Sequence, residues 1–92
     1  MGFTKESAVD AAKSDLAKRL NLSTNDIKVS GTSDTDFPDM SLGAAESGEM
    51  SAQMISSGWK IQLDANGKNY EYRGDKYQLR LKGFQGRNIK VG

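Results

Sequence analysis

Three short segments of alternating apolar and polar residues, separated by tight-turn signals, most constrain what this chain can fold into. Apolar side chains occupy every second position of residues 59–63, 70–72 and 77–81. Asn66-Gly67 between the first two segments is the strongest short hairpin signal, and Gly74-Asp75 separates the last two. The pattern predicts an antiparallel β-meander with one apolar inner face. That face is expected to consist of Trp59, Ile61, Leu63, Tyr70, Tyr72, Tyr77, Leu79 and Leu81.

An amphipathic helix is expected over residues 4–22, with Thr4 or Ser7 as its N-cap. Its apolar stripe repeats at spacings of three and four residues. The stripe consists of Val9, Ala12, Leu16 and Leu20. A sheet of this size cannot hide its inner face alone, so the helix is its expected cover. The sequence therefore predicts an α+β fold, in which one N-terminal helix packs on an antiparallel meander of four to five strands.

The remaining segments carry weaker patterns. A short strand is expected at residues 27–31, followed by a long acidic loop over residues 32–49 that shows no period of 2 or 3.6. We place the meander at residues 50–82, with 50–55 as a strand, although Met50 and Met54 are also one helical turn apart. Residues 83–92 are expected to form a tail, in which Ile89 and Val91 are able to add a short edge strand. The whole chain is one domain.

The composition narrows the chemistry. The chain of 92 residues contains no cysteine and no histidine, which removes disulfides, thiolate nucleophiles, imidazole bases and Cys/His metal sites. The formal net charge is +1, so no global field favours nucleic acid or an anionic membrane. Asp34, Asp36 and Asp39 are spaced like calcium ligands, but the required glycine and the bidentate glutamate are missing. We expect no enzyme, no metal and no cofactor.

Charge is divided unevenly along the chain. Residues 1–58 carry nine acids and five bases, whereas residues 59–92 carry three acids and eight bases. The loop 32–49 contains five acids and no base. The simplest expectation is that this acidic loop lies over or near the basic outer face of the meander.

The loop also holds the main candidate contact residues. Phe37, Met40 and Leu42 are apolar within a polar stretch, Pro38 stiffens the chain and Gly43 permits a sharp turn. One interpretation is that the apolar side chains pin the loop to the edge of the core. The other is that they dock into a partner while loop carboxylates steer a basic surface. The candidate binding residues are Phe37, Asp39, Met40, Leu42 and Glu46.

A second candidate surface is the outer face of the meander. Four basic residues project from neighbouring strands on the face opposite the aromatic side chains: Lys60, Arg73, Arg80 and Lys82. A nucleic-acid-binding sheet interleaves basic residues with exposed stacking rings. Here the rings belong to the other face, so a solvated outer face is the simpler interpretation and an anionic partner the alternative.

Several motifs resemble a group of small bacterial domains of unassigned function, which occur in secreted proteins and lipoproteins of cyanobacteria and related bacteria. The resemblance covers residues 8–81. It rests on the helix end at 15–20, Ile27-x-Val29, Phe37-Pro38-Asp39-x-Ser41-Leu42-Gly43, Gly58-Trp59-x-Ile61-x-Leu63, Gly67-x-x-Tyr70-x-Tyr72-Arg73 and Leu79-x-Leu81. Many members carry cysteine where Ser41 and Ala44 or Ala45 stand here, so no disulfide fixes this loop and its rigidity is open. The resemblance implies an extracytoplasmic α+β domain without known catalysis.

A weaker similarity is to the potato inhibitor I family of serine-peptidase inhibitors. It rests on Phe37-Pro38-Asp39, Glu71-Tyr72-Arg73 and Val91-Gly92. That family places an extended reactive loop before the Glu-Tyr-Arg strand, whereas this chain has only the tight turn at Asn66-Gly67.

These observations lead to one functional hypothesis and two alternatives. We expect a non-catalytic protein-interaction module of the bacterial cell envelope, extracytoplasmic and monomeric, that binds an unidentified protein through residues 36–49. A peptidase inhibitor-like domain and a binder of anions or nucleic acid are the alternatives, although we do not expect nucleic acid as a partner. No segment is apolar for long enough to span a membrane, and no signal peptide is present in this chain.

Overall fold

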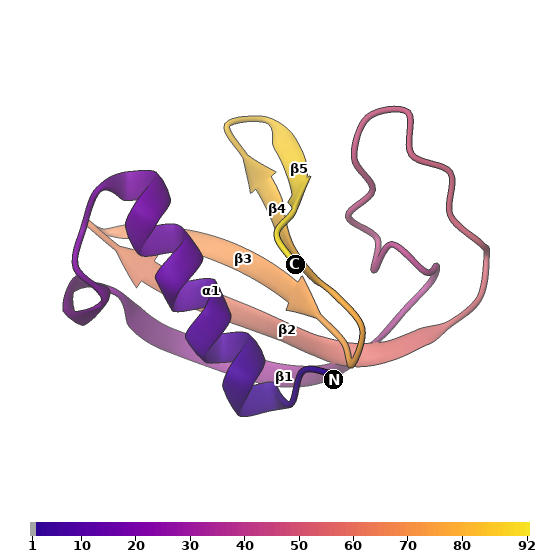
Figure 1. The fold of residues 1–92 in the computed structure, drawn as a ribbon, viewed down its shortest axis with the longest axis horizontal. Coiled ribbons are helices and arrows are strands. Elements are labelled where there is room, and N and C mark those ends of the chain that lie inside the picture. Colours follow the sequence, from indigo (N-terminus) through magenta and orange to yellow (C-terminus); the bar gives the residue numbers. More distant parts are fainter. Residues whose placement is uncertain (1) are drawn as a thin grey trace.

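The computed structural model describes residues 2–92 as one helix packed on a five-stranded antiparallel sheet (Figure 1). The strands lie in sequence order, β1-β2-β3-β4-β5. The elements are α1 (Lys5–Leu20), the short 3₁₀ helix η1 (Thr24–Asp26), β1 (Lys28–Phe37), β2 (Ser56–Ala65), β3 (Lys68–Gly74), β4 (Leu79–Phe84) and β5 (Arg87–Lys90). The α+β fold expected from the sequence is confirmed.

Capping residues at both ends of helix α1 form hydrogen bonds with backbone groups that lack a partner within the helix. Thr4 is the N-cap: its hydroxyl accepts the Ser7 amide at 3.1 Å, and the Ser7 hydroxyl accepts the Thr4 amide at 2.8 Å. Asn21 ends the helix in the left-handed conformation, with φ of 57°. The helix is therefore slightly shorter than the predicted range 4–22.

The main core lies between α1 and one face of the sheet. Ala12 and Leu16 of α1 are fully buried, as are Ile61 and Leu81 on the strands beneath them. The buried residues of this core are Ala8, Ala12, Leu16, Ala17, Ile27, Ile61, Leu63, Ala65, Tyr72, Leu79 and Leu81. Alternation along the strands places these sheet residues on one face, as the sequence predicts. We call the opposite face of the sheet the outer face.

A hydrogen bond across the core fixes the helix to the sheet. The buried Tyr72 hydroxyl donates to Asp15 at 2.7 Å, and Arg19 donates to the same carboxylate oxygen at 2.7 Å. Burial and the bond to Asp15 raise the pKa of Tyr72 above its ordinary value. Tyr72 therefore remains a neutral donor to the carboxylate.

Strand β1 is longer than the sequence predicts. It runs to Phe37 instead of ending at residue 31, and it pairs with β2 from Lys28↔Asp64 to Phe37↔Ser56, with a bulge between Val29 and Gly31. An edge strand that is largely exposed on both faces needs no alternation of apolar and polar residues. The serine, threonine and aspartate residues of β1 therefore give no strand pattern in the sequence. The loop consequently begins at Pro38 and includes residues 50–55, and the strand predicted there is wrong.

Two further differences lie near the C-terminus. Tyr77 was expected on the inner face but is 77% exposed, because it belongs to the turn before β4, where Asp75 accepts its amide at 2.8 Å. Residues 83–92 are not a tail: β4 continues to Phe84, and Gln85-Gly86, both with positive φ, connect it to β5, the edge strand that Ile89 was expected to be able to add.

Both ends of the described chain lie beside the turn between β3 and β4. The Phe3 amide donates to the Lys76 carbonyl at 2.9 Å. At the other end, the Leu79 amide donates to the Gly92 carbonyl at 2.9 Å, and the Val91 amide donates to Leu79 at 2.8 Å. Figure 1 shows the two ends on the same part of the molecule.

Candidate interaction site on the loop between β1 and β2

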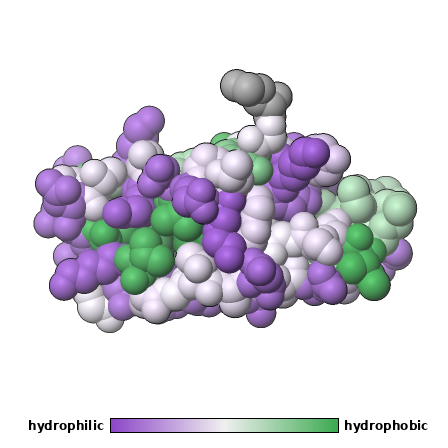
Figure 2. All heavy atoms as spheres, turned by 90° about the horizontal axis from the view of Figure 1, so that it is seen from below, coloured by the Kyte–Doolittle hydropathy of each residue, from purple (hydrophilic) through white to green (hydrophobic). Residues whose placement is uncertain are grey.

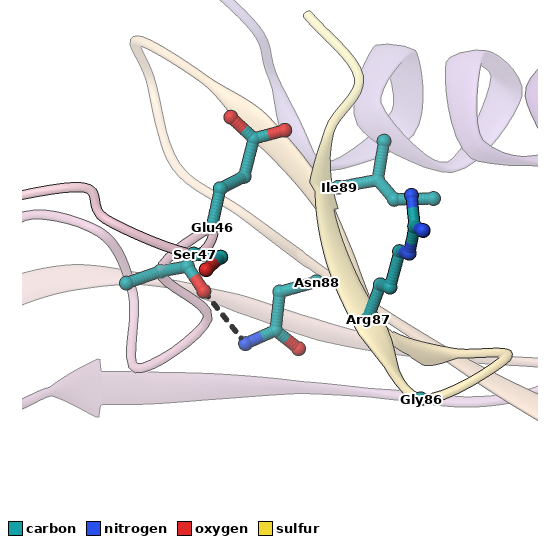
Figure 3. A pocket seen from close by; sticks show the side chains of 7 residues that line it. Glu46, Ser47, Gly86, Arg87, Asn88 and Ile89 are labelled. Atoms are coloured by element: carbon teal, nitrogen blue, oxygen red, sulfur yellow. Dashed lines mark hydrogen bonds between the residues drawn. The ribbon is translucent and has the colours of Figure 1, made fainter.

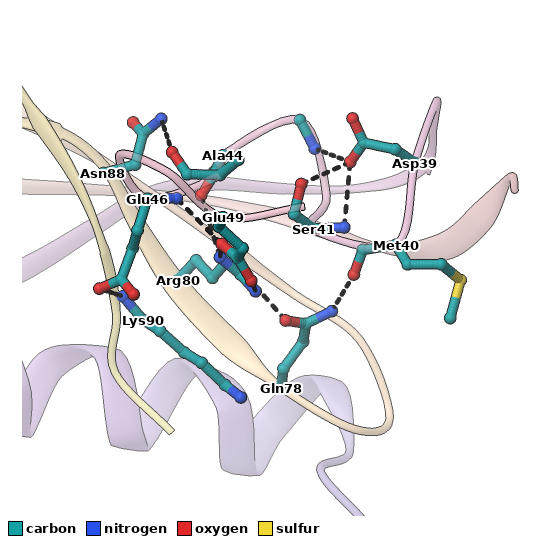
Figure 4. Close-up of polar contacts among 12 residues, drawn as sticks. Asp39, Met40, Ser41, Ala44, Glu46, Glu49, Gln78, Arg80, Asn88 and Lys90 are labelled. Carbon is teal, nitrogen blue, oxygen red and sulfur yellow. Dashed lines mark hydrogen bonds and ion pairs between the residues drawn. The ribbon is translucent and has the colours of Figure 1, made fainter. Parts of the chain in front are cut away.

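The β1–β2 loop, residues 38–55, is fastened to the outer face by an ion pair between the buried Arg80 and the partly exposed Glu49 (Figure 4). Two nitrogens of Arg80 donate to the two carboxylate oxygens of Glu49 at 2.5 and 2.6 Å. The Arg80 side chain is 3% exposed, and it also donates to Gln78 and to the Ala44 carbonyl. These bonds hold the pKa of Glu49 down at about 2, the Arg80 bond being the main cause and the Glu46 amide the next.

Contacts on either side of this ion pair extend the attachment. Gln78 donates its side-chain amide to the Met40 carbonyl, and Asn88 of β5 donates to the Ala45 carbonyl at 2.9 Å. The Lys90 amide donates to the Glu46 carboxylate at 3.0 Å. The predicted position of the acidic loop against the basic outer face is therefore confirmed, and the loop is held without a disulfide.

The first turn of the loop is organised by Asp39. One oxygen of its carboxylate accepts the Ser41 amide at 3.0 Å, the Ser41 hydroxyl at 2.7 Å and the Gly43 amide at 3.0 Å. These donors lower the pKa of Asp39, the Gly43 amide being the main cause. Leu42 and Gly43 have positive φ values of 62° and 65°, and Arg73 donates to the Leu42 carbonyl at 2.9 Å. This turn is rigid because its backbone donors are satisfied from within.

The five predicted binding residues have different surroundings. Phe37 and Leu42 are buried at 2% and 0% exposure, which corrects the expectation that they dock into a partner: they anchor the loop to the outer face. Asp39 is half-buried and used in its turn, whereas Met40 is 39% exposed. Glu46 is exposed but bonded to the Lys90 amide.

The basic face is largely neutralised by the loop and by neighbouring residues, so the solvated outer face expected from the sequence is wrong for Arg80. Arg80 is buried against Glu49, and Arg73 pairs with Glu71 at 2.6 Å while its guanidinium lies 5.4 Å from the centre of the Phe37 ring. Lys60 is half-buried and Lys82 is exposed. The arrangement does not favour an anion-binding surface.

The exposed apolar surface of the loop lies in a part that the sequence analysis assigned to a strand. Met50 is 96% exposed, Met54 63% and Ile55 74%. Figure 2 shows apolar surface at the right-hand end of the molecule, which is the end where Figure 1 places this loop. The sequence signal for it was ambiguous, because Met50 and Met54 alternate as in a strand and are also one helical turn apart.

A shallow groove of about 750 Å³ separates the loop from the β4–β5 hairpin (Figure 3). Glu46 and Ser47 line it on the loop side, and Arg87, Asn88 and Ile89 line it on β5. The Asn88 side-chain amide donates to the Ala45 carbonyl, which links the two sides of the groove. The groove thus presents one cation, one carboxylate and an aliphatic side chain close together.

Other site types find little support in the part of the chain that the structure describes. Within residues 2–92 no group of three or more acidic, cysteine or histidine side chains is placed to hold a metal. No helix in that range has the length and apolar character needed to cross a bilayer. The connection between β2 and β3 is the tight turn Asn66-Gly67, with φ of 52° and 76°, so the place of a peptidase-inhibitor reactive loop is not extended.

Comparisons with known proteins give one match. Neither the curated proteins nor the solved structures contain a significant match to this chain. A family model described as a domain of unknown function, DUF8738, matches residues 9–81, from the first turns of α1 into β4. That range includes the whole β1–β2 loop together with Arg80, its main anchor. The chain therefore belongs to the DUF8738 family of domains of unknown function.

Proposed function

We propose that this domain is a non-catalytic protein-interaction module, which binds its partner through the exposed apolar part of the β1–β2 loop. The contact residues are Met50, Met54 and Ile55, with Met40 beside them. Extracytoplasmic location at a bacterial cell envelope is part of the proposal and rests on the resemblance described above.

The observation that carries the proposal is the contrast between a fixed base and an exposed tip. Glu49 is held by two bonds to Arg80, yet the next residue, Met50, is 96% exposed. A loop that is ordered in this way loses less conformational entropy on binding than a free segment does. Exposed methionines adapt their unbranched side chains to an apolar partner surface and are frequent at such contacts.

The loop carboxylates contribute less to partner binding in this proposal than the sequence suggested. Asp39 and Glu49 are both used in bonds within the domain, so neither is free to steer a basic partner. Apolar contact, rather than charge, is the main expected source of affinity.

Affinity capture with matched baits tests the proposal. The parent domain is compared with Met50→Ser/Met54→Ser/Ile55→Ser, and with the control variant Val29→Ser/Tyr77→Ser, which removes exposed apolar side chains elsewhere. Thermal unfolding confirms that all three baits are folded. The expected result is a partner that the parent and the control retain and the loop variant loses.

Equal capture by all three baits would show that the loop tip is not the contact surface. Loss from both variants would indicate nonspecific apolar adhesion, which also contradicts the proposal. A partner lost only from the control bait would move the interaction to β1 or to the turn before β4.

A further inference from the structure

Strand β1 forms an uncovered edge of the sheet. Among the described residues, β2 is its one strand neighbour, and it is ten residues long. Adjacent residues in an antiparallel edge strand direct their amide and carbonyl groups alternately toward the neighbour and away from it. Among residues 2–92, the one hydrogen bond to the β1 backbone from outside the ladder with β2 is donated by the Thr35 hydroxyl to the Ser33 carbonyl, at 3.4 Å.

The opposite edge of the sheet, strand β5, is covered by the β1–β2 loop. On β5 the Lys90 amide is bonded to Glu46, and the Asn88 side chain is bonded to the Ala45 carbonyl, so the β1–β2 loop borders that edge. The fold thus covers a four-residue edge and leaves the ten-residue one open. Open edges are templates for another strand.

The usable part of the β1 edge is short and well defined. The bulge between Val29 and Gly31 interrupts the ladder at one end, and Pro38 follows the strand at the other. The regular stretch between them, residues 31–36, spans about 20 Å at the rise of an antiparallel strand. That length accepts a segment of about six residues.

Two carboxylates give this edge a charge. Asp34 and Asp36 lie opposite Trp59 and Ser57 in the register, so both are on the α1 side of the sheet, about 7 Å apart along the strand. The Asp34 side chain is 80% exposed and pairs with Lys5 at 2.9 Å, and Asp36 accepts the Ser57 hydroxyl at 2.8 Å. An exposed ion pair such as Lys5–Asp34 contributes little free energy, so a cation of an incoming peptide can replace Lys5 beside Asp34.

The same carboxylates disfavour a second copy of this chain as the occupant. Antiparallel pairing of two β1 edges places directly opposite residues on the same face. The Asp34 and Asp36 side chains of both copies would then gather on one side of the joined sheet. Like charges in that arrangement are destabilising, and charged edge strands protect natural sheets from self-association.

We infer that the β1 edge, residues 31–36, binds an extended basic peptide segment by adding it to the sheet as a sixth strand. Two lysine or arginine residues spaced two apart in that segment would lie on one face, at the spacing of Asp34 and Asp36. Main-chain hydrogen bonds supply the alignment, and the two carboxylates supply the preference for cations. This surface is separate from the apolar loop tip.

Peptide titration followed by two-dimensional NMR tests the inference. The probe is a six-residue peptide of alternating lysine and threonine, blocked at both ends. One control peptide replaces lysine with glutamate, and the other keeps the lysines and replaces two of the three threonines with proline, which removes strand hydrogen bonds and keeps the charge. We expect amide shifts and slowed hydrogen exchange at residues 31–36 with the first peptide only.

Variants then separate the carboxylates from general electrostatics. Asp34→Asn/Asp36→Asn is expected to weaken the Kd of the lysine peptide at least tenfold. The matched control Glu6→Gln/Asp10→Asn removes the same charge from exposed positions on α1 and is expected to leave the Kd within twofold. Equal binding of the proline peptide, or shifts centred outside residues 31–36, would overturn the inference. Dimerisation of the free domain through β1, seen by sedimentation, would overturn the choice of occupant.

Discussion

Arg80 occupies a position where alternation along the strand predicts an exposed cation on the outer face, yet its side chain is 3% exposed. A guanidinium is excluded from water at low cost only when its donors are paired. Here Glu49 takes two donors, and Gln78 and the Ala44 carbonyl take others. One side chain thereby fixes the conformation of a loop that has no secondary structure.

Removing the acid of this pair tests its contribution to stability. Glu49→Gln leaves the buried Arg80 without a counter-charge, so we expect the free energy of unfolding to fall by about 1–3 kcal/mol. Urea denaturation measures the change. The control Asp10→Asn, at an exposed position of α1, is expected to change stability by less than about 0.5 kcal/mol. Equal effects of the two substitutions would contradict a structural role for the ion pair.

The same pair gives the domain a defined acid sensitivity. The pKa of Glu49 is lowered in the folded state from 4.5 to about 2. A carboxylate with a depressed pKa contributes stability above its unfolded pKa, and the contribution disappears as the pH falls through the folded pKa. Melting temperature should therefore decline between about pH 4.5 and pH 2, and more steeply in the parent than in Glu49→Gln. Parallel melting curves over that range would show that Glu49 is not the group responsible.

The candidate site was predictable only in outline at this scale. The surplus of acids in the loop and of bases in the strands correctly places the loop on the outer face, but charge counting does not identify which pair meets. Phe37 and Leu42 were correctly selected as unusual apolar residues, and sequence alone left their two interpretations open. Burial decides in favour of anchoring, because both side chains are enclosed beneath the loop.

Among the elements, those with an apolar period were predicted well and those without one were not. Helix α1 and strands β2 and β3 each bury one face, so their periods are visible in the sequence. Strand β1 is an edge strand built from serine, threonine and aspartate, and its existence beyond residue 31 follows from backbone pairing to β2. Met50 and Met54 alternate as in a strand, but no neighbouring strand is available to pair with them.

Gly58 leaves no room for a side chain against β3, and this contact is open to a direct test. A Cβ on Gly58 would collide with the Gly74 carbonyl oxygen, whereas a Cβ on Gly31 would meet nothing within 4 Å. Gly58→Ala is expected to destabilise the domain by about 3 kcal/mol through backbone displacement, and Gly31→Ala by less than about 0.5 kcal/mol. Thermal unfolding of both variants gives the comparison. A mild effect at Gly58 would mean that the strands separate easily there.

At the scale of the molecule, the sheet supports a different kind of structure on each face. The main core under α1 contains most of the buried apolar side chains, whereas Phe37, Leu42 and Ala44 are buried outside it, beneath the β1–β2 loop. The second group is much smaller, and polar contacts from Arg80, Gln78 and Asn88 add to its attachment. Regions with few apolar contacts open at lower free energy than the global core.

Hydrogen exchange should consequently resolve two levels of protection. Amides of β2, β3 and α1 are expected to exchange through global unfolding, and those of Leu42 and Ala44 through a smaller opening that releases the loop. Glu49→Gln is expected to accelerate amide hydrogen exchange both in the loop and in β3. The factor of acceleration in the loop should be more than ten times the factor in β3. Uniform acceleration throughout the domain would indicate a single cooperative unit instead.

The adjacency of the two ends has a consequence for how this domain combines with others. Phe3 and Gly92 are both hydrogen-bonded at the turn between β3 and β4, so a host chain interrupted at one surface loop could continue across that point with little change in direction. The same geometry allows the ends to be joined by a short linker and the chain reopened at Asn66-Gly67, on the β2–β3 connection. Such a circular permutant keeps every strand neighbour and moves both ends to the turn between β2 and β3.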